Sequence, residues 1–122
     1  VPILGICAGH QFMARFHGGD ARESPEPEFG AMQIQLHDGG GTIFDRTNES
    51  QTVWESHNDE VHEVPDGFFI TASSDSCKVQ GMENENGDRF GLQFHPEVND
   101  SEFGKEMFEN FVEVCRKARA SK

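Results

Sequence analysis

The five residues Gly5-Ile6-Cys7-Ala8-Gly9 fit the pattern G-x-nucleophile-x-G, in which a sharp turn between a strand and a helix exposes the middle side chain. Here the middle side chain is the Cys7 thiol. At the start of a helix, unpaired N–H groups and the helix dipole favour a thiolate, and the Ala8 amide could stabilise an oxyanion. The motif predicts a cysteine nucleophile. A small buried cysteine at a glycine-rich turn fits the same five residues equally well.

A candidate base lies near the other end of the chain, in the segment Phe94-His95-Pro96-Glu97-Val98. Pro96 fixes its own φ and biases His95 towards an extended conformation, so the side chains of His95 and Glu97 can project to the same side. Glu97 could then orient the imidazole. A cysteine, a distant histidine and a neighbouring carboxylate are the parts of a nucleophilic Cys-His-acid site. Taken alone, His95 also fits a strand-end histidine with a satisfied hydrogen bond.

The elements expected around these residues are a strand, a turn and a helix, followed mainly by strands. Residues 2–6 form an apolar run typical of a buried strand, and residues 10–17 carry apolar side chains at helical spacing. Further strands are predicted at residues 29–36, 52–55, 68–72, 78–83 and 89–94, and Asn86-Gly87 predicts a hairpin turn between the last two. The sheet is expected to be mixed.

The remaining segments are predicted to be loops and a closing helix. Residues 24–28 contain two prolines among acidic residues and predict an exposed loop, and the three glycines at 39–41 predict a turn. Asp100 and Ser101 are each a good N-cap for the last helix. Its apolar face is predicted to carry Phe103, Met107, Phe108, Phe111, Val112 and Cys115.

The composition limits the class of protein. The 122 residues include 22 acidic and 10 basic side chains, a formal charge of −12, which argues against a nucleic-acid or anionic-membrane surface. With 34% hydrophobic residues and 11 Phe, the chain can build one core. No apolar run approaches the length of about 18 residues that spans a bilayer, so we expect a soluble cytoplasmic protein. The three cysteines form no C-x-x-C pair and suggest neither a disulfide framework nor a zinc site.

Other polar groups carry weaker signals. His57, Asp59, His62 and Glu63 are close in sequence but form no H-E-x-x-H motif, so we predict a solvated polar loop there and no metal site. The glycines at 39–41 lack the Lys and Ser/Thr of a phosphate-binding P-loop. Cys77 follows a polar stretch and is expected to be exposed and oxidisable.

The two long motifs together carry a family resemblance. Residues 2–11 (PILGICAGHQ) and 93–97 (QFHPE) resemble the class I, or triad-type, glutamine amidotransferases, in which a Cys, a His and a Glu hydrolyse glutamine to glutamate and ammonia. The segments 53–61 (VWESHNDEV) and 94–99 (FHPEVN) look most like the glutaminase component of GMP synthase, in particular the stand-alone archaeal form. The resemblance implies an α/β fold, the C-terminal part of a flavodoxin-like three-layer domain with a mixed β-sheet and a nucleophile elbow.

The resemblance implies a role for each matching residue. Cys7 is the nucleophile, His95 is the general base and then the general acid, and Glu97 orients the imidazole. The family usually has glycine where Asn58 stands, and asparagine also tolerates φ > 0. Five residues are implied to form the substrate-binding set: Ala8, Gln11, Ser56, His57 and Asn58.

The resemblance also implies a domain organisation and a partner. Residues 1–122 correspond to the C-terminal portion of a type-1 glutamine amidotransferase domain, and we expect a fragment that has little activity alone, because the family's first strands and the Gly-rich segment with the second oxyanion N–H have no counterpart. The implied partner is an ATP-pyrophosphatase (synthetase) subunit that holds ATP and Mg²⁺, with no cofactor in this chain. The alternatives are a glutaminase subunit of anthranilate synthase or carbamoyl phosphate synthase, and a non-catalytic amidotransferase-like binding module.

Overall fold

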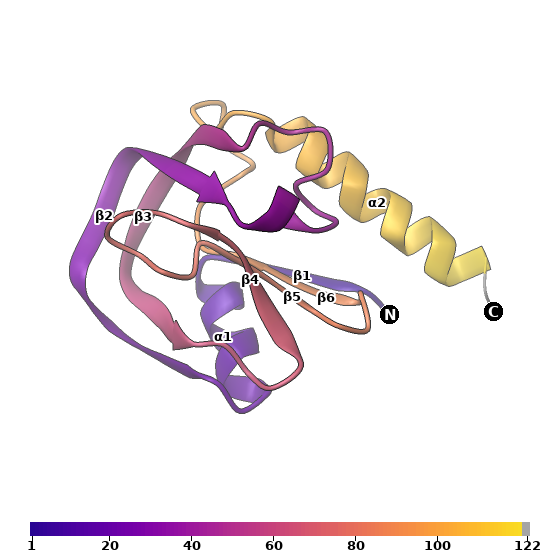
Figure 1. The fold of residues 1–122 in the computed structure, drawn as a ribbon, viewed down its shortest axis with the longest axis horizontal. Helices are drawn as coiled ribbons and strands as arrows, with labels where there is room; N and C mark the ends of the chain where they lie inside the picture. Colours follow the sequence, from indigo (N-terminus) through magenta and orange to yellow (C-terminus); the bar gives the residue numbers. More distant parts are fainter. Residues whose placement is uncertain (121–122) are drawn as a thin grey trace.

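The computed structural model describes residues 1–120, in which six strands form one sheet in the order β1-β6-β5-β4-β2-β3 (Figure 1). Only β1 and β6 run parallel, and the other neighbours are antiparallel, so the predicted mixed sheet is confirmed. The strands are β1 (Ile3–Ile6), β2 (Asp20–Leu36), β3 (Ser50–Glu63), β4 (Phe68–Ser73), β5 (Gly81–Asn84) and β6 (Arg89–Leu92).

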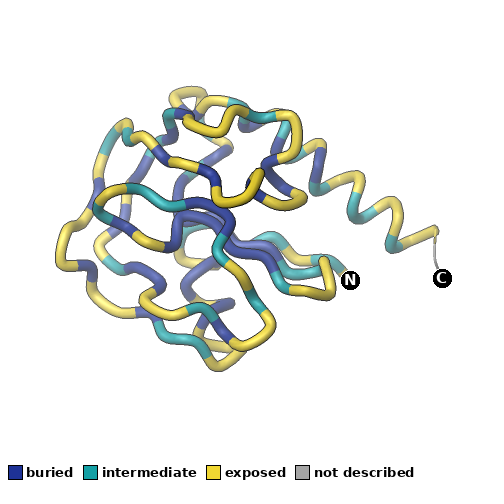
Figure 2. Tube along the Cα trace, in the orientation of Figure 1, coloured by how far each residue is buried: buried dark blue, intermediate teal, exposed yellow. Residues whose placement is uncertain are grey.

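Two helices, α1 (Ala8–Phe16) and α2 (Gly104–Ala120), cover opposite faces of the sheet (Figure 1). The alternation along β6 shows this arrangement, because Phe90 and Leu92 belong to the same core cluster as Met107 of α2. Gly91 between them faces α1, where an added Cβ would lie 2.3 Å from Nδ1 of His10. The fold is therefore three-layered, as expected, with the buried residues concentrated along the central strands (Figure 2). Within residues 1–120, neither helix combines the length and apolar composition needed to span a membrane.

The hairpin predicted at Asn86-Gly87 joins β5 to β6, and Gly87 adopts φ 72°. The Asn84 carboxamide stabilises the turn by accepting the backbone N–H groups of Asp88 and Arg89, both at 3.0 Å. The three glycines at 39–41 also lie in a turn, which contains the short 3₁₀ helix η1 (Asp38–Gly40) and connects β2 to β3. Both turn predictions are confirmed.

The loop predicted at residues 24–28 is wrong, because these residues belong to β2. Ser24 and Glu28 are buried, whereas residues 25–27 are exposed, as predicted. The pairing of β2 with β3 shifts register between Glu23 and Glu28, so the two prolines lie where the ladder is interrupted and no backbone N–H is required. The strand predicted at residues 52–55 is likewise longer, because β3 continues to Glu63.

The predicted start of the last helix at Asp100 or Ser101 is also wrong. Helix α2 begins at Gly104, after Phe103 with φ 60°. The prediction of the apolar face of α2 is only partly right, because Val112 is 49% exposed. Asn110 is buried in its place and donates from its amide to the carbonyls of Ile43 and Asp45 at 2.8 and 2.7 Å.

Candidate active site

Cys7 lies at the turn between β1 and α1, with φ 53° and ψ −106°. A positive φ at a residue with a side chain stores backbone strain, which persists only when the surroundings hold it. The Cys7 N–H donates to the Leu92 carbonyl of β6 at 2.8 Å, and its carbonyl accepts from Gln11 N–H at 3.1 Å. The strained strand-to-helix elbow predicted from the sequence is confirmed.

The two glycines of the elbow motif differ in their importance. A Cβ at Gly5 would lie 2.7 Å from the Gly9 carbonyl oxygen and 2.9 Å from the His10 nitrogen, so the first turn of α1 packs directly on the β1 backbone. At Gly9, apart from the backbone of its own helix and its chain neighbours, no described atom lies within 4 Å of the position a Cβ would take. Only the first glycine is therefore required by the close approach of strand and helix.

The environment of the Cys7 sulfur favours the protonated thiol. Its Sγ donates to the Ser56 carbonyl at 3.6 Å and accepts from Gln93 Nε2 at 3.8 Å. Burial raises the pKa of Cys7, the Ala8 N–H opposes this rise, and the carboxylates of Glu55 and Glu97 add to it. The helix start therefore does not by itself produce a thiolate, and the sulfur needs a base.

His95, the base predicted from the sequence, lies beside the carboxylate that is predicted to orient it. His95 Nδ1 lies 2.8 Å from Glu97 Oε2, which confirms that the two side chains project to the same side. A carboxylate at this distance favours the Nδ1–H tautomer and leaves Nε2 as the nitrogen that exchanges protons. The Cys7 thiol and the His95 backbone N–H both donate to carbonyls of β3, those of Ser56 and Trp54, so the same strand holds the nucleophile and the histidine.

The five predicted substrate-binding residues fall into two groups. Ala8, Ser56 and Asn58 are exposed, the first at the start of α1 and the others on β3. Asn58 is not among the described residues with positive φ, so it occupies its position in an ordinary extended conformation.

The side chains of Gln11 and His57 are turned inward. Gln11 Nε2 donates to the Asp59 carbonyl at 2.8 Å and to Gln93 Oε1 at 3.3 Å. His57 is 3% exposed. A contact of any of the five residues with glutamine stays a prediction.

Comparison with known proteins agrees with this geometry: residues 1–115 match the family glutamine amidotransferase class-I. The chain belongs to this family. It is 49% identical over 117 residues to a glutamine-hydrolyzing GMP synthase subunit of Sulfolobus acidocaldarius, and 50% identical over 117 residues to the protein of the same name from Saccharolobus solfataricus. Each match covers 96% of this chain and 62% of the relative, so the chain spans about three-fifths of the length of these relatives.

Solved structures agree with the family assignment. A structure from Thermoplasma acidophilum, described as a GMP synthase subunit, superposes with a TM-score of 0.94 at 39% identity and covers 98% of this chain and 59% of that one. A glutamine amidotransferase from Thermotoga maritima, with a TM-score of 0.74 and 23% identity over 99% of this chain and 49% of that one, shares the fold.

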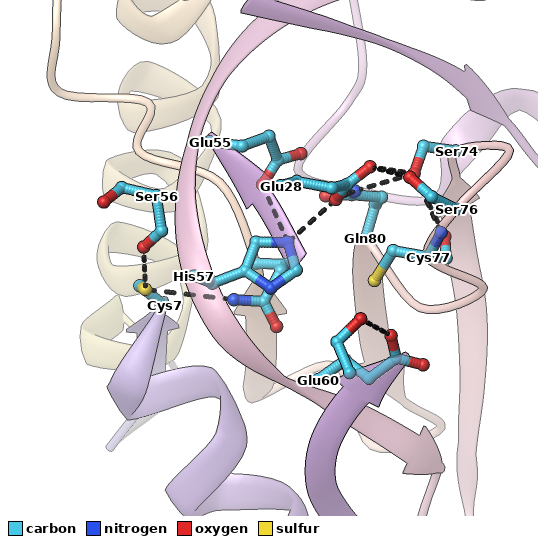
Figure 3. Close-up of polar contacts among 12 residues, drawn as sticks. Cys7, Glu28, Glu55, Ser56, His57, Glu60, Ser74, Ser76, Cys77 and Gln80 are labelled. Carbon is cyan, nitrogen blue, oxygen red and sulfur yellow. Dashed lines mark hydrogen bonds and ion pairs between the residues drawn. The ribbon is translucent and has the colours of Figure 1, made fainter. Parts of the chain in front are cut away.

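Beneath the elbow, this class I amidotransferase contains a buried polar cluster around His57, made of Glu28, Glu55, His57, Cys77 and Gln80 (Figure 3). His57 Nε2 lies 2.8 Å from Glu28 Oε1, and Nδ1 lies 2.8 Å from the Asp59 carbonyl. Both partners are acceptors, so the ring carries a proton on each nitrogen. Burial alone would lower the pKa of His57, but these two bonds and the negative charges outweigh it and raise the pKa.

The solvated loop predicted around His57 is therefore wrong. The alternation of β3 places Gln51, Val53, Glu55 and His57 on one buried face. The sequence carries a signal for this, because the three polar residues share their two-residue period with a valine. The polar residues between them, which face the other side, obscure that signal.

Cys77 is also placed differently from the prediction. It is 1% exposed, and its Sγ donates to the Val79 carbonyl at 3.7 Å. Burial, followed by the charges of Glu28 and Glu60, raises the pKa of the Cys77 thiol strongly. The expectation of an exposed, oxidisable thiol is wrong, because both access and thiolate character are lacking.

Three atoms of this cluster have ligand character. One atom each from Glu28, His57 and Cys77 lies within 4.8 Å of the other two. The two Glu28 oxygens are already engaged, Oε1 with His57 and Gln80 and Oε2 with the hydroxyls of Ser74 and Ser76. Hydrogen bonds inside the protein thus account for this group, and the absence of a metal stays a prediction.

Glu55 is the unusual member of the cluster. It is 0% exposed, neither carboxyl oxygen has a hydrogen-bond partner among residues 1–120, and Oε1 lies 3.6 Å from His57 Nε2. Burial and then the charge of Glu28 raise the pKa of Glu55 to about 8. The side chain is therefore mainly protonated at neutral pH, which limits the cost of burying it.

This protonation predicts a pH dependence of stability. Between about pH 4.5 and 8 the folded protein holds a proton on Glu55 that the unfolded chain releases, so the free energy of unfolding falls as the pH rises through this range. Glu55→Gln removes this titration. We therefore expect its free energy of unfolding to fall less between pH 4.5 and 8 than that of the parent protein, by up to about a few kcal/mol. Urea unfolding at pH 5, 6.5 and 8 measures it. The exposed Glu26→Gln is the control, and an unchanged slope in Glu55→Gln would contradict the assignment.

Proposed function

We propose that this chain is the glutamine-hydrolysing component of a cytoplasmic GMP synthase. The observation that carries the proposal is the strained Cys7 elbow together with the His95–Glu97 pair at 2.8 Å, since the Cys7 thiol and the His95 N–H both donate to carbonyls of β3. The names of the relatives at 49% and 50% identity support GMP synthase over other amidotransferases.

The proposed reaction begins with the Cys7 thiol. His95 takes the thiol proton at Nε2, and Sγ attacks the carboxamide carbon of glutamine. The oxygen of the tetrahedral intermediate becomes negative and accepts from the Ala8 backbone N–H. The C–N bond then breaks as His95 returns the proton to the leaving ammonia.

The second half of the reaction releases the enzyme. A γ-glutamyl thioester remains on Cys7, and His95 takes a proton from water as the hydroxyl attacks the thioester carbon. The C–S bond breaks, the thiolate regains its proton from His95, and glutamate leaves. Throughout, the Glu97 carboxylate holds Nδ1–H and stabilises the imidazolium.

Ammonia is proposed to pass to an ATP-pyrophosphatase partner subunit. That subunit would bind ATP and Mg²⁺ and activate xanthosine 5′-monophosphate, which ammonia then converts to GMP. This chain would need no cofactor of its own, because both half-reactions above use only its side chains, a backbone N–H and water.

The test supplies the full-length protein with glutamine and one candidate acceptor system at a time. We expect glutamine-dependent GMP formation with the ATP-pyrophosphatase partner, ATP, Mg²⁺ and xanthosine 5′-monophosphate. Glutamine-dependent product only with an anthranilate synthase or carbamoyl phosphate synthase partner would replace the assignment. Binding to a partner with no glutamine hydrolysis would indicate a non-catalytic module.

A further inference from the structure

The strand β3 lies at one end of the sheet, so within the part of the chain that the structure describes one edge of it has no strand neighbour. Its residues Thr52, Trp54 and Ser56 lie opposite Gln33, Ala31 and Phe29 of β2. Residues two apart along a strand present their backbone groups to the same side. An edge of this kind offers unpaired N–H and C=O groups to whatever lies next to it.

The segments that carry the proposed catalytic residues form hydrogen bonds with successive residues of this edge. The backbone of Thr52 bonds Glu102 twice: Thr52 N–H donates to Oε1 at 2.7 Å, and Thr52 C=O accepts from Glu102 N–H at 2.9 Å. At Trp54, the carbonyl accepts the backbone N–H of His95 at 2.9 Å. At Ser56, the carbonyl accepts the Cys7 thiol at 3.6 Å.

The Ser101 side chain links the backbones of Trp54 and His95. Its hydroxyl accepts the Trp54 N–H at 2.8 Å and donates to the His95 carbonyl at 2.7 Å, while the His95 N–H donates to the Trp54 carbonyl. Ser101 is 8% exposed, so water does not readily replace it. One hydroxyl thus completes a closed ring of three hydrogen bonds that includes both backbone groups of His95.

The chain next to Ser101 also packs closely, at the start of α2. An added Cβ at Gly104 would lie 2.1 Å from the Pro96 carbonyl oxygen, so the first residue of α2 rests on the backbone next to His95. The two ends of the segment, at residues 95–96 and 101–104, are therefore held against the β3 edge and against each other, although residues 97, 99 and 100 between them are exposed. The serine that the sequence suggested as a helix N-cap has its hydroxyl engaged in this contact instead.

We propose that Ser101 is a positioning residue for glutamine hydrolysis, fixing the His95 backbone on the same strand edge that receives the Cys7 thiol. Trp54 and Ser56 are two residues apart, about 6.6 Å along a strand. The β3 edge thus sets the distance between the base and the nucleophile, and Ser101 keeps the base at its place on that edge. This inference rests on the function proposed above.

The test compares three variants of the full-length protein. Ser101→Ala loses both hydrogen bonds, and we expect kcat for glutamine hydrolysis to fall about tenfold to a hundredfold with little change in KM, because a misplaced base slows chemistry without removing a substrate contact. Ser101→Thr keeps the hydroxyl and should restore most of kcat. The control is Ser24→Ala, at a buried serine that also donates once and accepts once, to Glu60 Oε1 at 2.6 Å and from Glu26 N–H at 3.1 Å. It should leave kcat unchanged.

A second measurement does not depend on turnover. Amide hydrogen exchange at Trp54 and His95 should be faster in Ser101→Ala than in the parent protein and in Ser24→Ala. An unchanged kcat in Ser101→Ala, an equal loss in Ser24→Ala, no recovery in Ser101→Thr, or unchanged exchange at both amides would each overturn the proposal. A different result would show that the proposed function itself is wrong: the parent protein and Cys7→Ala would hydrolyse glutamine equally slowly. The exchange measurement would still decide whether Ser101 holds the His95 backbone in place.

Discussion

Cys7→Ala is expected to lower glutamine hydrolysis by about 10⁴-fold or more, because no other group can form the γ-glutamyl thioester. The complex with the proposed synthetase partner should still make GMP from added ammonium salt at close to the parental rate, since the proposal places the acceptor chemistry on the other subunit. Glutamate release and GMP formation, each measured with glutamine and with ammonium, separate the two activities.

Cys115→Ala is the matched control for this substitution. Cys115 is also a free cysteine of intermediate exposure, but it lies on α2. Its replacement should leave both activities unchanged. Loss of ammonia-dependent synthesis in a properly assembled Cys7→Ala complex would show that the division of labour between the subunits is wrong.

His95→Ala should cost about 10²–10⁴-fold in kcat, because in the proposed mechanism the imidazole moves a proton in every step of the reaction. Glu97→Gln should cost clearly less. The Glu97 side chain is 50% exposed, so water already screens part of its charge, and a rotated carboxamide can still accept the Nδ1–H at the observed 2.8 Å. The kcat values of the two variants, with folding checked by circular dichroism, establish the order.

Equal losses in His95→Ala and Glu97→Gln would contradict this order and give the carboxylate a direct part in proton transfer. Glu102→Gln offers a comparison within the same loop, since Glu102 Oε1 accepts the Thr52 N–H, which a carboxamide oxygen can also do. This neighbouring change of charge should leave kcat close to that of the parent protein.

Part of this site is readable in the sequence because its chemistry is local. The elbow is contained in residues 5–9, and the orientation of His95 by Glu97 needs only two residues on one side of an extended segment. The Asn86-Gly87 hairpin is local in the same sense, since a turn with positive φ depends on its own few residues. In each case the interacting groups are neighbours along the chain.

The failed predictions concern residues whose neighbours are distant in sequence. The local pattern predicts loops at Glu28 and His57, yet each is buried because β2 pairs with β3 along most of its length and brings the two side chains to 2.8 Å. Cys77 is buried by the same cluster. A polar residue can be hidden only where partners satisfy it, and these partners are supplied by other strands.

Ser101 shows the same division most clearly. Its residue type and its place before an amphipathic segment predict a helix cap, which is a local role. The free edge of β3 supplies a competing donor at Trp54 and the loop supplies an acceptor at His95, and these bonds engage its hydroxyl, while α2 starts later, at Gly104. The amino-acid order is thus sufficient to assign the family and to predict the nucleophile, the base and its carboxylate, because their signals are short and contiguous. Long-range strand pairing, which no short segment encodes, sets the register that places these residues along one strand edge. The same pairing buries the charged side chains beneath that edge.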